Sequence, residues 1–264
     1  MDIYPTREAK NIAKIYFEDK FGIKTIDGSL FSKDLKDIIT KDIQRFIEGE
    51  PLQYITGKTF FYNNFFKVDE SVLIPRPETE LLVDYAIKNI SNHKNSTILD
   101  IGTGSGCIAL SIADKIPDCR IIGIDISTGA LDTANQNKNI LKINNVEFKQ
   151  MDFLNKSETD KLGKFDMIIS NPPYIDRDEK KIMSNSTLKY EPELALFPNG
   201  NNTMIFYHKI IEFAKTHLNN NGVVFCEINE FKYKEIKELL EKNGFKYQIL
   251  NDLQCKPRIV QFPL

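Results

Sequence analysis

Apolar residues recur at helical spacing in two segments of the first fifty residues, 6–21 and 32–47. Ser32 is placed to cap the second segment, and Gly49 stands just past its end. Two short amphipathic helices are not stable alone in water, so they must pack on each other and on the body of the protein. We therefore predict a small N-terminal helical domain over residues 1–50.

The pattern changes in residues 51–78 to short apolar runs interrupted by turn residues and prolines. Aromatic-rich runs at residues 59–62 and 65–68 flank a turn at Asn63-Asn64, which predicts a β-hairpin. The hairpin either covers an active-site cleft, acts as a hinge between two domains, or closes the core. We assign this segment to a linker that contains the hairpin.

The remaining residues, 79–264, are predicted to form the main domain. A helix with carboxylates in its first turn is expected from Glu80 to Ile90. Strands and helices then alternate, which is typical of an α/β fold with a mostly parallel sheet and helices on both faces. The predicted strands are residues 97–101, 121–126, 146–150, 165–170, 222–228, 245–250 and 258–262, and the helices between them are residues 107–115, 128–141, 203–218 and 232–242.

A glycine-rich loop joins the first predicted strand to its helix, with the pattern Gly-x-Gly-x-Gly from Gly102 to Gly106. Glycines permit a tight turn and close approach of a ligand, while helix N–H groups point into the same space. Asp125, at the end of the second strand, can accept hydrogen bonds from both hydroxyls of a ribose, as in dinucleotide-binding enzymes. The spacing of the glycines and the preceding Asp100 favour S-adenosylmethionine (AdoMet) over NAD.

The third predicted strand ends at Asp152-Phe153. In this geometry Asp152 lies where the amino group of an adenine would be, and Phe153 can pack on the base. The alternative is that Asp152 only caps the next helix.

The fourth predicted strand ends at Asn171-Pro172-Pro173-Tyr174. Neither proline has a donor hydrogen, so the ladder stops there and polar groups are left at the edge of the sheet where ligands bind. The Asn171 side-chain oxygen and the Pro172 carbonyl can each accept one N–H of a planar NH₂ group, and Tyr174 can stack on it. The scheme relies on positioning and requires no catalytic His, Cys or carboxylate pair, and we expect none at the turn. The alternative is a plain structural turn.

Composition limits the remaining possibilities. The 35 basic and 37 acidic residues give a net charge of −2 with both signs spread along the 264 residues, which argues against direct binding of nucleic acid. The four cysteines are far apart and the three histidines are near no cysteine–carboxylate cluster, so we predict no metal site. With no signal pattern and no apolar run of ~20 residues, we expect a soluble cytoplasmic protein that does not associate with membranes.

The glycine loop, the acid after the second strand and the Asn-Pro-Pro-Tyr turn resemble the AdoMet-dependent methyltransferases that modify exocyclic or amide nitrogens. The turn alone does not distinguish adenine N6, guanine N2 and glutamine N5. Flanking motifs extend the resemblance over nearly the whole chain to the bacterial and organellar peptide-chain release factor glutamine methyltransferases. These motifs are residues 49–57, 73–80, 100–106, 171–175 and 190–196.

The resemblance implies a Rossmann-like class I AdoMet-dependent methyltransferase fold. It implies methylation of the glutamine in the Gly-Gly-Gln loop of release factors, with the N-terminal helices binding the release factor away from the chemistry, and we expect the enzyme to be a monomer. The substrate glutamine is assigned to Asn171, Pro172, Pro173 and Tyr174. Contacts with AdoMet are assigned to Gly102, Thr103, Gly104, Ser105, Gly106, Asp125, Phe153 and Asn171.

Two rival functions differ in what they require. A nucleic-acid base methyltransferase must extrude its base and hold the backbone with cations, and we find no basic patch or added RNA-binding domain for this. A non-catalytic AdoMet-binding partner of the ribosome machinery has no use for an ordered Asn171. The sequence departs from the family pattern at residues 202–204, at Asn229 and at Lys256, which leaves both predicted sites intact.

Overall fold

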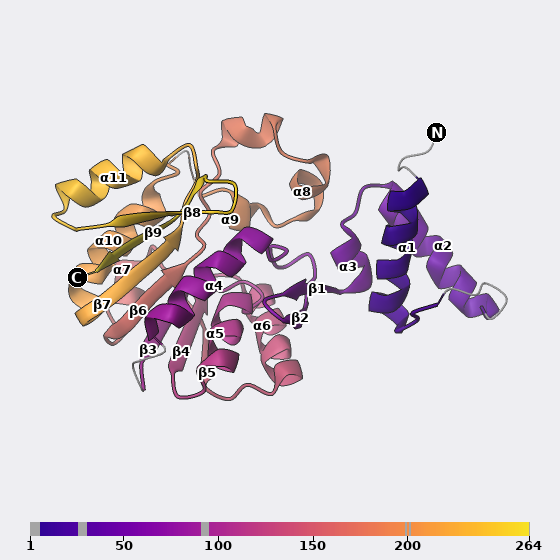
Figure 1. The fold of residues 1–264 in the computed structure, drawn as a ribbon, viewed down its shortest axis with the longest axis horizontal. Coiled ribbons are helices and arrows are strands. Elements are labelled where there is room, and N and C mark those ends of the chain that lie inside the picture. Colours follow the sequence, from indigo (N-terminus) through magenta and orange to yellow (C-terminus); the bar gives the residue numbers. More distant parts are fainter. Residues whose placement is uncertain (1–5, 26–30, 91–94, 199, 201, 264) are drawn as a thin grey trace.

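The computed structural model describes residues 6–25, 31–90, 95–198, 200 and 202–263, and seven strands within these ranges form one sheet. The strands are β3 (Thr97–Ile101), β4 (Arg120–Asp125), β5 (Val146–Gln150), β6 (Phe165–Ser170), β7 (Leu218–Glu227), β8 (Gln248–Asn251) and β9 (Pro257–Pro263). Their order is β5-β4-β3-β6-β7-β9-β8, and β9 runs in the direction opposite to the other six (Figure 1). The predicted α/β class with a mostly parallel, Rossmann-like sheet is therefore confirmed.

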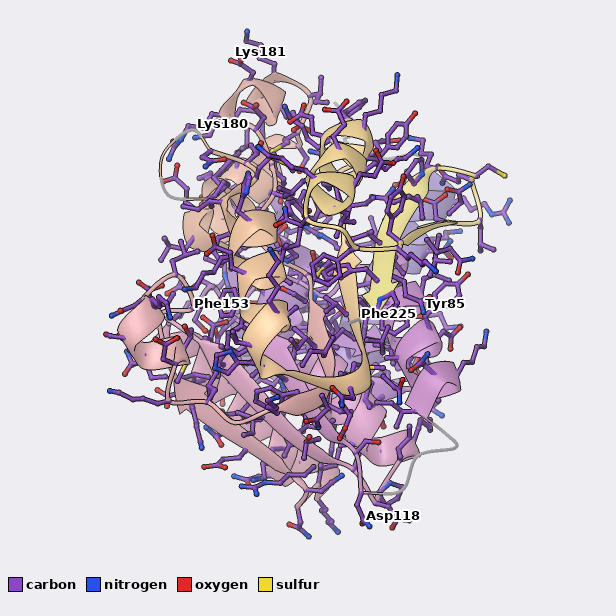
Figure 2. The ribbon with its side chains drawn as sticks, turned by 90° about the vertical axis from the view of Figure 1, so that its left-hand side faces the viewer. Tyr85, Asp118, Phe153, Lys180, Lys181 and Phe225 are labelled. Carbon is purple, nitrogen blue, oxygen red and sulfur yellow. The ribbon has the colours of Figure 1, made fainter. Side chains whose placement is uncertain are left out.

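Helices cover both faces of the sheet because alternate residues of its buried strands are apolar on both sides. Ile98 of β3 packs in one core with α4 (Pro77–Ile90) and α5 (Cys107–Lys115). Its neighbour Leu99 packs in a second core with α10 (Ile205–His217) and α11 (Tyr233–Lys242). Figure 2 shows the two layers, with Tyr85 and Phe153 on opposite sides of the sheet. The other long helix of this domain is α6 (Thr128–Leu141).

Short helical segments occupy the connections after β5 and β6. They are α7 (Lys156–Thr159), the 3₁₀ helix η2 (Arg177–Lys181), α8 (Asn185–Tyr190) and α9 (Glu193–Leu196). In Figure 1, α8 and α9 lie above the carboxyl edge of the sheet, on the side nearest the N-terminal helices.

Helix α4 begins at Pro77, three residues before the predicted start at Glu80. Proline is favoured at the first helical position because its missing N–H has no partner there in any case. The earlier start places Thr79 in the first turn of the helix, where its side chain is buried.

The predicted hairpin is formed by β1 (Lys58–Phe61) and β2 (Asn64–Lys67), but its turn lies one residue earlier than expected. Tyr62 and Asn63 occupy the turn with φ of 44° and 67°, the left-handed pair that a two-residue hairpin turn requires. Phe61 and Phe66 are fully buried in the core beneath α4, and their neighbours Phe60 and Phe65 face solvent. The predicted role of closing the core is therefore confirmed.

The N-terminal helices α1 (Thr6–Phe21) and α2 (Lys33–Ile47) form where they were predicted, and Ser32 caps α2 by accepting a hydrogen bond from the Leu35 N–H. A short helix, α3 (Leu52–Thr56), lies within the predicted linker, and its Ile55 packs with Tyr16 and Phe17 of α1. Figure 1 shows these three helices to one side of the sheet, joined to it through the hairpin.

One charged group is buried between the N-terminal helices. Asp42 of α2 accepts hydrogen bonds from the Tyr16 hydroxyl at 2.6 Å and from Lys20 Nζ at 2.5 Å. Lys20 also donates to the Ile55 carbonyl at 2.9 Å, so this network joins all three helices.

None of the helices described by the structure is both long enough and apolar enough to span a bilayer. In the same residues, no group of three or more His, Cys, Asp or Glu side chains is placed to hold a metal ion.

Candidate active site

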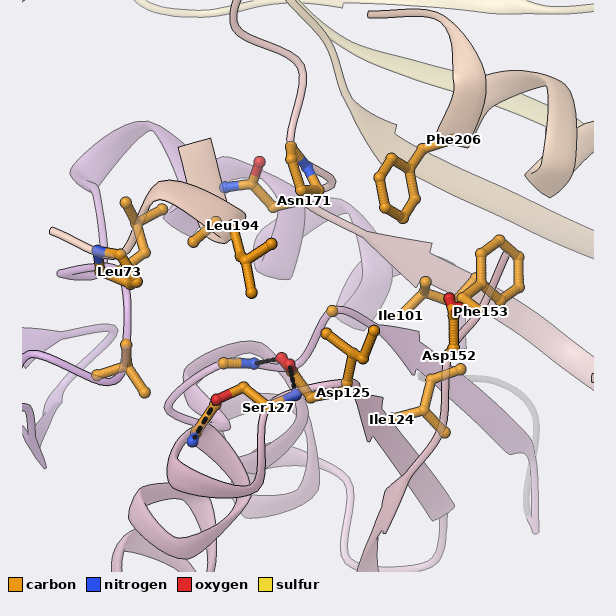
Figure 3. Close-up of a pocket in the computed structure, with 18 of the residues that line it drawn as sticks. Leu73, Ile101, Ile124, Asp125, Ser127, Asp152, Phe153, Asn171, Leu194 and Phe206 are labelled. Carbon is orange, nitrogen blue, oxygen red and sulfur yellow. Dashed lines mark hydrogen bonds between the residues drawn. The ribbon is translucent and has the colours of Figure 1, made fainter. Parts of the chain in front are cut away.

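The carboxyl ends of four parallel strands border a cleft of about 1050 Å³, including its open mouth, which we call the first cleft (Figure 3). Each strand contributes a predicted site residue to its lining: Gly102 follows β3, Asp125 ends β4, Asp152 follows β5 and Asn171 follows β6. Ligands of open α/β sheets bind at this edge. The structure therefore brings the predicted residues of separate motifs to one place.

The three glycines of the loop between β3 and α5 serve two purposes. All three have positive φ, of 71° at Gly102, 54° at Gly104 and 78° at Gly106. A Cβ atom on Gly102 or Gly104 would meet no other residue's side chain within 4 Å, so their backbones face open space. A Cβ atom on Gly106 would lie 2.8 Å from Phe148 Cζ, so this glycine is required for packing.

The other two predicted loop residues face inward. Thr103 and Ser105 are both buried and do not line the first cleft, and the Thr103 hydroxyl donates to Asp100 Oδ2 at 2.6 Å. Any contact that these two residues make with a ligand in the first cleft therefore involves their backbones. Burial raises the pKa of Asp100 to about 7, against the effect of the Thr103 hydrogen bond.

Asp125 lies at the centre of the loop's hydrogen bonds. Its Oδ2 accepts from the Gly104 N–H at 2.9 Å, and its Oδ1 accepts from the Ser127 N–H at 3.0 Å. Burial raises the pKa of Asp125, and the hydrogen bonds from Ser127 and Gly104 oppose that rise. Each oxygen of a carboxylate has a second lone pair, so Asp125 can accept further hydrogen bonds from a ligand in the cleft.

The end of β5 supplies the next wall of the first cleft. Asp152 Oδ1 accepts a hydrogen bond from the Leu154 N–H at 2.9 Å, and the residue that caps α7 is Asn155. Asp152 is therefore not the cap of that helix. Phe153 is nearly buried, with its ring edge-on to Phe213, and Figure 3 shows it at the same end of the cleft as Phe206.

The Asn-Pro-Pro-Tyr turn separates the first cleft from a second cleft of about 680 Å³. Asn171 lines both clefts, Pro173 lines the first, and Pro172 and Tyr174 line the second. The Asn171 Nδ2 donates to Thr79 Oγ1 at 3.1 Å, which leaves Oδ1 as its acceptor. The two clefts thus meet at a carboxamide whose nitrogen has a partner in α4.

Two residues at this turn, Thr79 and Glu227, were not predicted from the sequence. Glu227, a single carboxylate at the end of β7, lines the second cleft, is 2% exposed, and accepts hydrogen bonds from Thr79 and Tyr174. The spacing of apolar residues gives no information about either one. Thr79 lies in a proline-rich motif, and Glu227 ends a strand whose other residues near that end are apolar. The feature of the sequence that could have indicated Glu227 is that it is a single acidic residue near the end of a predicted strand.

Two of the flanking motifs meet at the rim of the second cleft. Arg76 Nη2 forms an ion pair with Glu191 Oε1 at 2.6 Å, and Glu191 Oε2 accepts from the Ile74 N–H at 3.2 Å. Glu191 is buried, so this pair fixes the segment before α4 to the segment after α8.

Asn229, at which the sequence departs from the family pattern, is also buried, and its Nδ2 donates to Glu179 Oε1 of η2 at 2.8 Å.

The fold and the first cleft define a methyltransferase. A family model described as "Methyltransferase domain" matches residues 92–256. Among solved structures, a methyltransferase from Pyrococcus furiosus superposes with a TM-score of 0.53 at 19% identity, covering 88% of this chain and 98% of that chain.

The chain belongs, more narrowly, to the release factor glutamine methyltransferase family. It is 41% identical over 269 aligned residues to the release factor glutamine methyltransferase of Flavobacterium psychrophilum, covering 98% of this chain and 93% of that protein. It is 35% identical to the corresponding protein of Bacteroides thetaiotaomicron, covering 98% and 94%. The family resemblance of the sequence motifs is thereby confirmed.

Proposed function

We propose that the protein transfers a methyl group from AdoMet to the side-chain amide nitrogen of the glutamine in the Gly-Gly-Gln loop of release factors. One observation supports this most strongly: the first cleft, at the carboxyl ends of the strands, and the second cleft meet at Asn171, whose amide oxygen is available as an acceptor. Membership of the release factor glutamine methyltransferase family supports the choice of substrate.

The first cleft has the features that AdoMet requires. Gly102 and Gly104 leave space beside the backbone, Asp125 retains lone pairs for ribose hydroxyls, and Phe153 and Phe206 supply apolar surface for an adenine. When bound, AdoMet supplies an electrophilic methyl group on a sulfonium.

The second cleft receives the glutamine side chain in this proposal. An amide nitrogen is a poor nucleophile because its lone pair is delocalised into the carbonyl. Asn171 Oδ1 and the Pro172 carbonyl accept the two N–H groups and fix the plane of the amide, and the Tyr174 ring packs on its face. Catalysis then comes from orientation and from the exclusion of water.

The N-terminal helices, residues 1–50, form the docking domain of the proposal, residues 51–78 the linker, and residues 79–264 the catalytic domain. Ile15 on α1 and Ile43 and Ile47 on α2 have about half of their surface exposed. Apolar side chains on a helical surface beside the catalytic domain suit contact with a large protein substrate.

The experiment that tests the proposed function supplies labelled AdoMet to the protein together with either a release factor or total RNA and DNA. We expect label to enter the release factor and not the nucleic acid. Label in nucleic acid alone would establish the base-methyltransferase alternative, and cofactor binding without transfer to either would establish a non-catalytic role.

A further inference from the structure

The carboxylate of Glu227 accepts hydrogen bonds from two segments of the active site. Its Oε2 accepts a hydrogen bond from Thr79 Oγ1 at 2.7 Å, and its Oε1 accepts from the Tyr174 hydroxyl at 2.8 Å. The carboxylate is 2% exposed and lies at the end of β7, beside the turn that follows β6. It therefore connects the first turn of α4 to the Asn-Pro-Pro-Tyr turn.

The direction of these hydrogen bonds follows from what each group can donate. Burial raises the pKa of Glu227, and the hydrogen bonds from Thr79 and Tyr174 oppose that rise. At a pH above that raised pKa the carboxylate is ionised and only accepts, so Thr79 and Tyr174 both donate to it. A hydroxyl has one hydrogen, and Thr79 has used it on Glu227. Toward Asn171, Thr79 can then only accept, which requires that the amide turn its nitrogen toward Thr79 and its oxygen away.

A carboxamide is nearly symmetric in shape, so packing alone does not decide which end of Asn171 faces the substrate. If the end were reversed, the Asn171 NH₂ would face the NH₂ of the substrate glutamine, and two donors would oppose each other. The Glu227 carboxylate, the Thr79 hydroxyl and the Asn171 amide form a chain of hydrogen bonds. The negative charge on Glu227 thereby fixes which end of the Asn171 amide faces the substrate.

We propose that Glu227 and Thr79 are positioning residues that set the orientation of the Asn171 amide, with Glu227 also fixing the Tyr174 ring through its hydroxyl. This inference rests on the proposed function, because the oriented oxygen is the acceptor of the glutamine N–H. Neither residue takes part in the transfer itself.

The first test compares Thr79→Val with Thr79→Ser in the full chain. Valine has nearly the same shape without the hydroxyl, and serine keeps the hydroxyl. We expect kcat for methylation of a release factor to fall about 10- to 100-fold in Thr79→Val with KM within about threefold, and to return to within about threefold of wild type in Thr79→Ser. Thr159→Val, at another buried threonine whose hydroxyl bonds backbone carbonyls in α7, is the matched control and should leave kcat unchanged.

The companion substitution is Glu227→Gln, which keeps the shape of the side chain but lets one end donate to Thr79. The Thr79 hydrogen is then free to point at Asn171 and reverse its amide. We expect kcat to fall by a similar factor in Glu227→Gln and in Thr79→Val. In the double variant kcat should fall no further than in the worse single variant. The proposal would be overturned in favour of simple packing if the decreases in kcat multiplied in the double variant. Equal decreases in Thr79→Val and Thr79→Ser would overturn it as well.

A readout that does not depend on turnover separates this inference from the proposed function. NMR of the Asn171 side-chain amide in the full chain should show solvent exchange about tenfold faster in Thr79→Val than in wild type, restored in Thr79→Ser. An amide signal unaffected by Thr79→Val would contradict the inference whatever the substrate. Absence of methyl transfer by the wild-type protein would instead contradict the proposed function, while the NMR comparison still decides the orientation.

Discussion

The two clefts that meet at Asn171 are built in different ways. The first cleft is held by contacts between segments that are close in sequence, as in the hydrogen bond from the Gly104 N–H to the Asp125 side chain, 21 residues apart. The second depends on side chains brought together from distant segments: Thr79 is 92 residues from Asn171 and 148 from Glu227. The comparison teaches that cofactor binding and amide orientation are separable, so single substitutions should affect one and spare the other.

The largest expected effect is that of Asn171→Ala on turnover. Loss of a preorganised polar contact made to the reacting group lowers kcat by ~100-fold or more. The dissociation constant for AdoMet should stay within about tenfold, or ~1.4 kcal/mol, because the variant keeps Gly102, Gly104, Asp125 and Phe153 in the first cleft. Steady-state kinetics and calorimetry measure the two quantities. Asn135→Ala, at an exposed asparagine that bonds within its own helix α6, is the control, and unchanged turnover in Asn171→Ala would refute the amide clamp.

The next effect is that of Asp125→Asn on cofactor binding. Because hydrogen bonds to a charged acceptor are worth ~1.5–3 kcal/mol each, we expect AdoMet affinity to fall about 10- to 100-fold, with a smaller change in kcat at saturating AdoMet. Burial raises the pKa of Asp125, and the ionised form is the better acceptor. Wild-type affinity should therefore weaken as the pH falls through that raised pKa, and this dependence should be lost in Asp125→Asn. Calorimetry at several pH values tests both points, and an identical pH dependence in the variant would count against the assignment of Asp125.

Gly106→Ala is a milder way to disturb the first cleft. The backbone there has positive φ and the new Cβ would lie 2.8 Å from Phe148 Cζ, so we expect a loss of ~1–3 kcal/mol in the free energy of unfolding. Gly163→Ala is the control, because Gly163 has no positive φ and its new Cβ meets nothing within 4 Å. Denaturant titration measures both, and equal stability of the two variants would show that the loop tolerates a side chain at 106.

The smallest effect concerns docking by the N-terminal helices. Replacing both Ile43 and Ile47 by Glu should raise KM for an intact release factor about three- to tenfold and leave AdoMet affinity unchanged. A peptide limited to the Gly-Gly-Gln loop should show no such difference. Ile140→Glu, at a residue on α6 exposed to a similar degree, is the control. A KM equal to that of wild type would assign these helices a structural role alone.

The same comparison explains how much of the site the sequence alone could predict. The glycine loop, Asp125 and the turn at Asn171 were predicted because each stands at a strand end, and parallel strand ends meet at one edge of the sheet. The inward direction of Thr103 and Ser105 depends on the local backbone of the loop. Residue type in a motif does not specify which way a side chain points.

The interactions that orient Asn171 could not be predicted from local pattern. Thr79 became part of the site because α4 starts at Pro77 and packs its first turn against β7, an arrangement decided by tertiary structure. Glu227 lies within the predicted strand 222–228, and its role is visible only through its two hydroxyl partners. The hairpin turn was displaced by one residue because Tyr62 adopts positive φ, which is uncommon for an aromatic residue.

The central claim is that Asn171 presents its amide oxygen to the NH₂ of a glutamine side chain, and the most direct test is mass spectrometry of a release factor after incubation with AdoMet and the protein. We predict one added methyl group, located by fragmentation on the side-chain nitrogen of the glutamine in the Gly-Gly-Gln loop, and its loss with Asn171→Ala. A methyl group on another residue, or the same product yield from Asn171→Ala, would contradict the account.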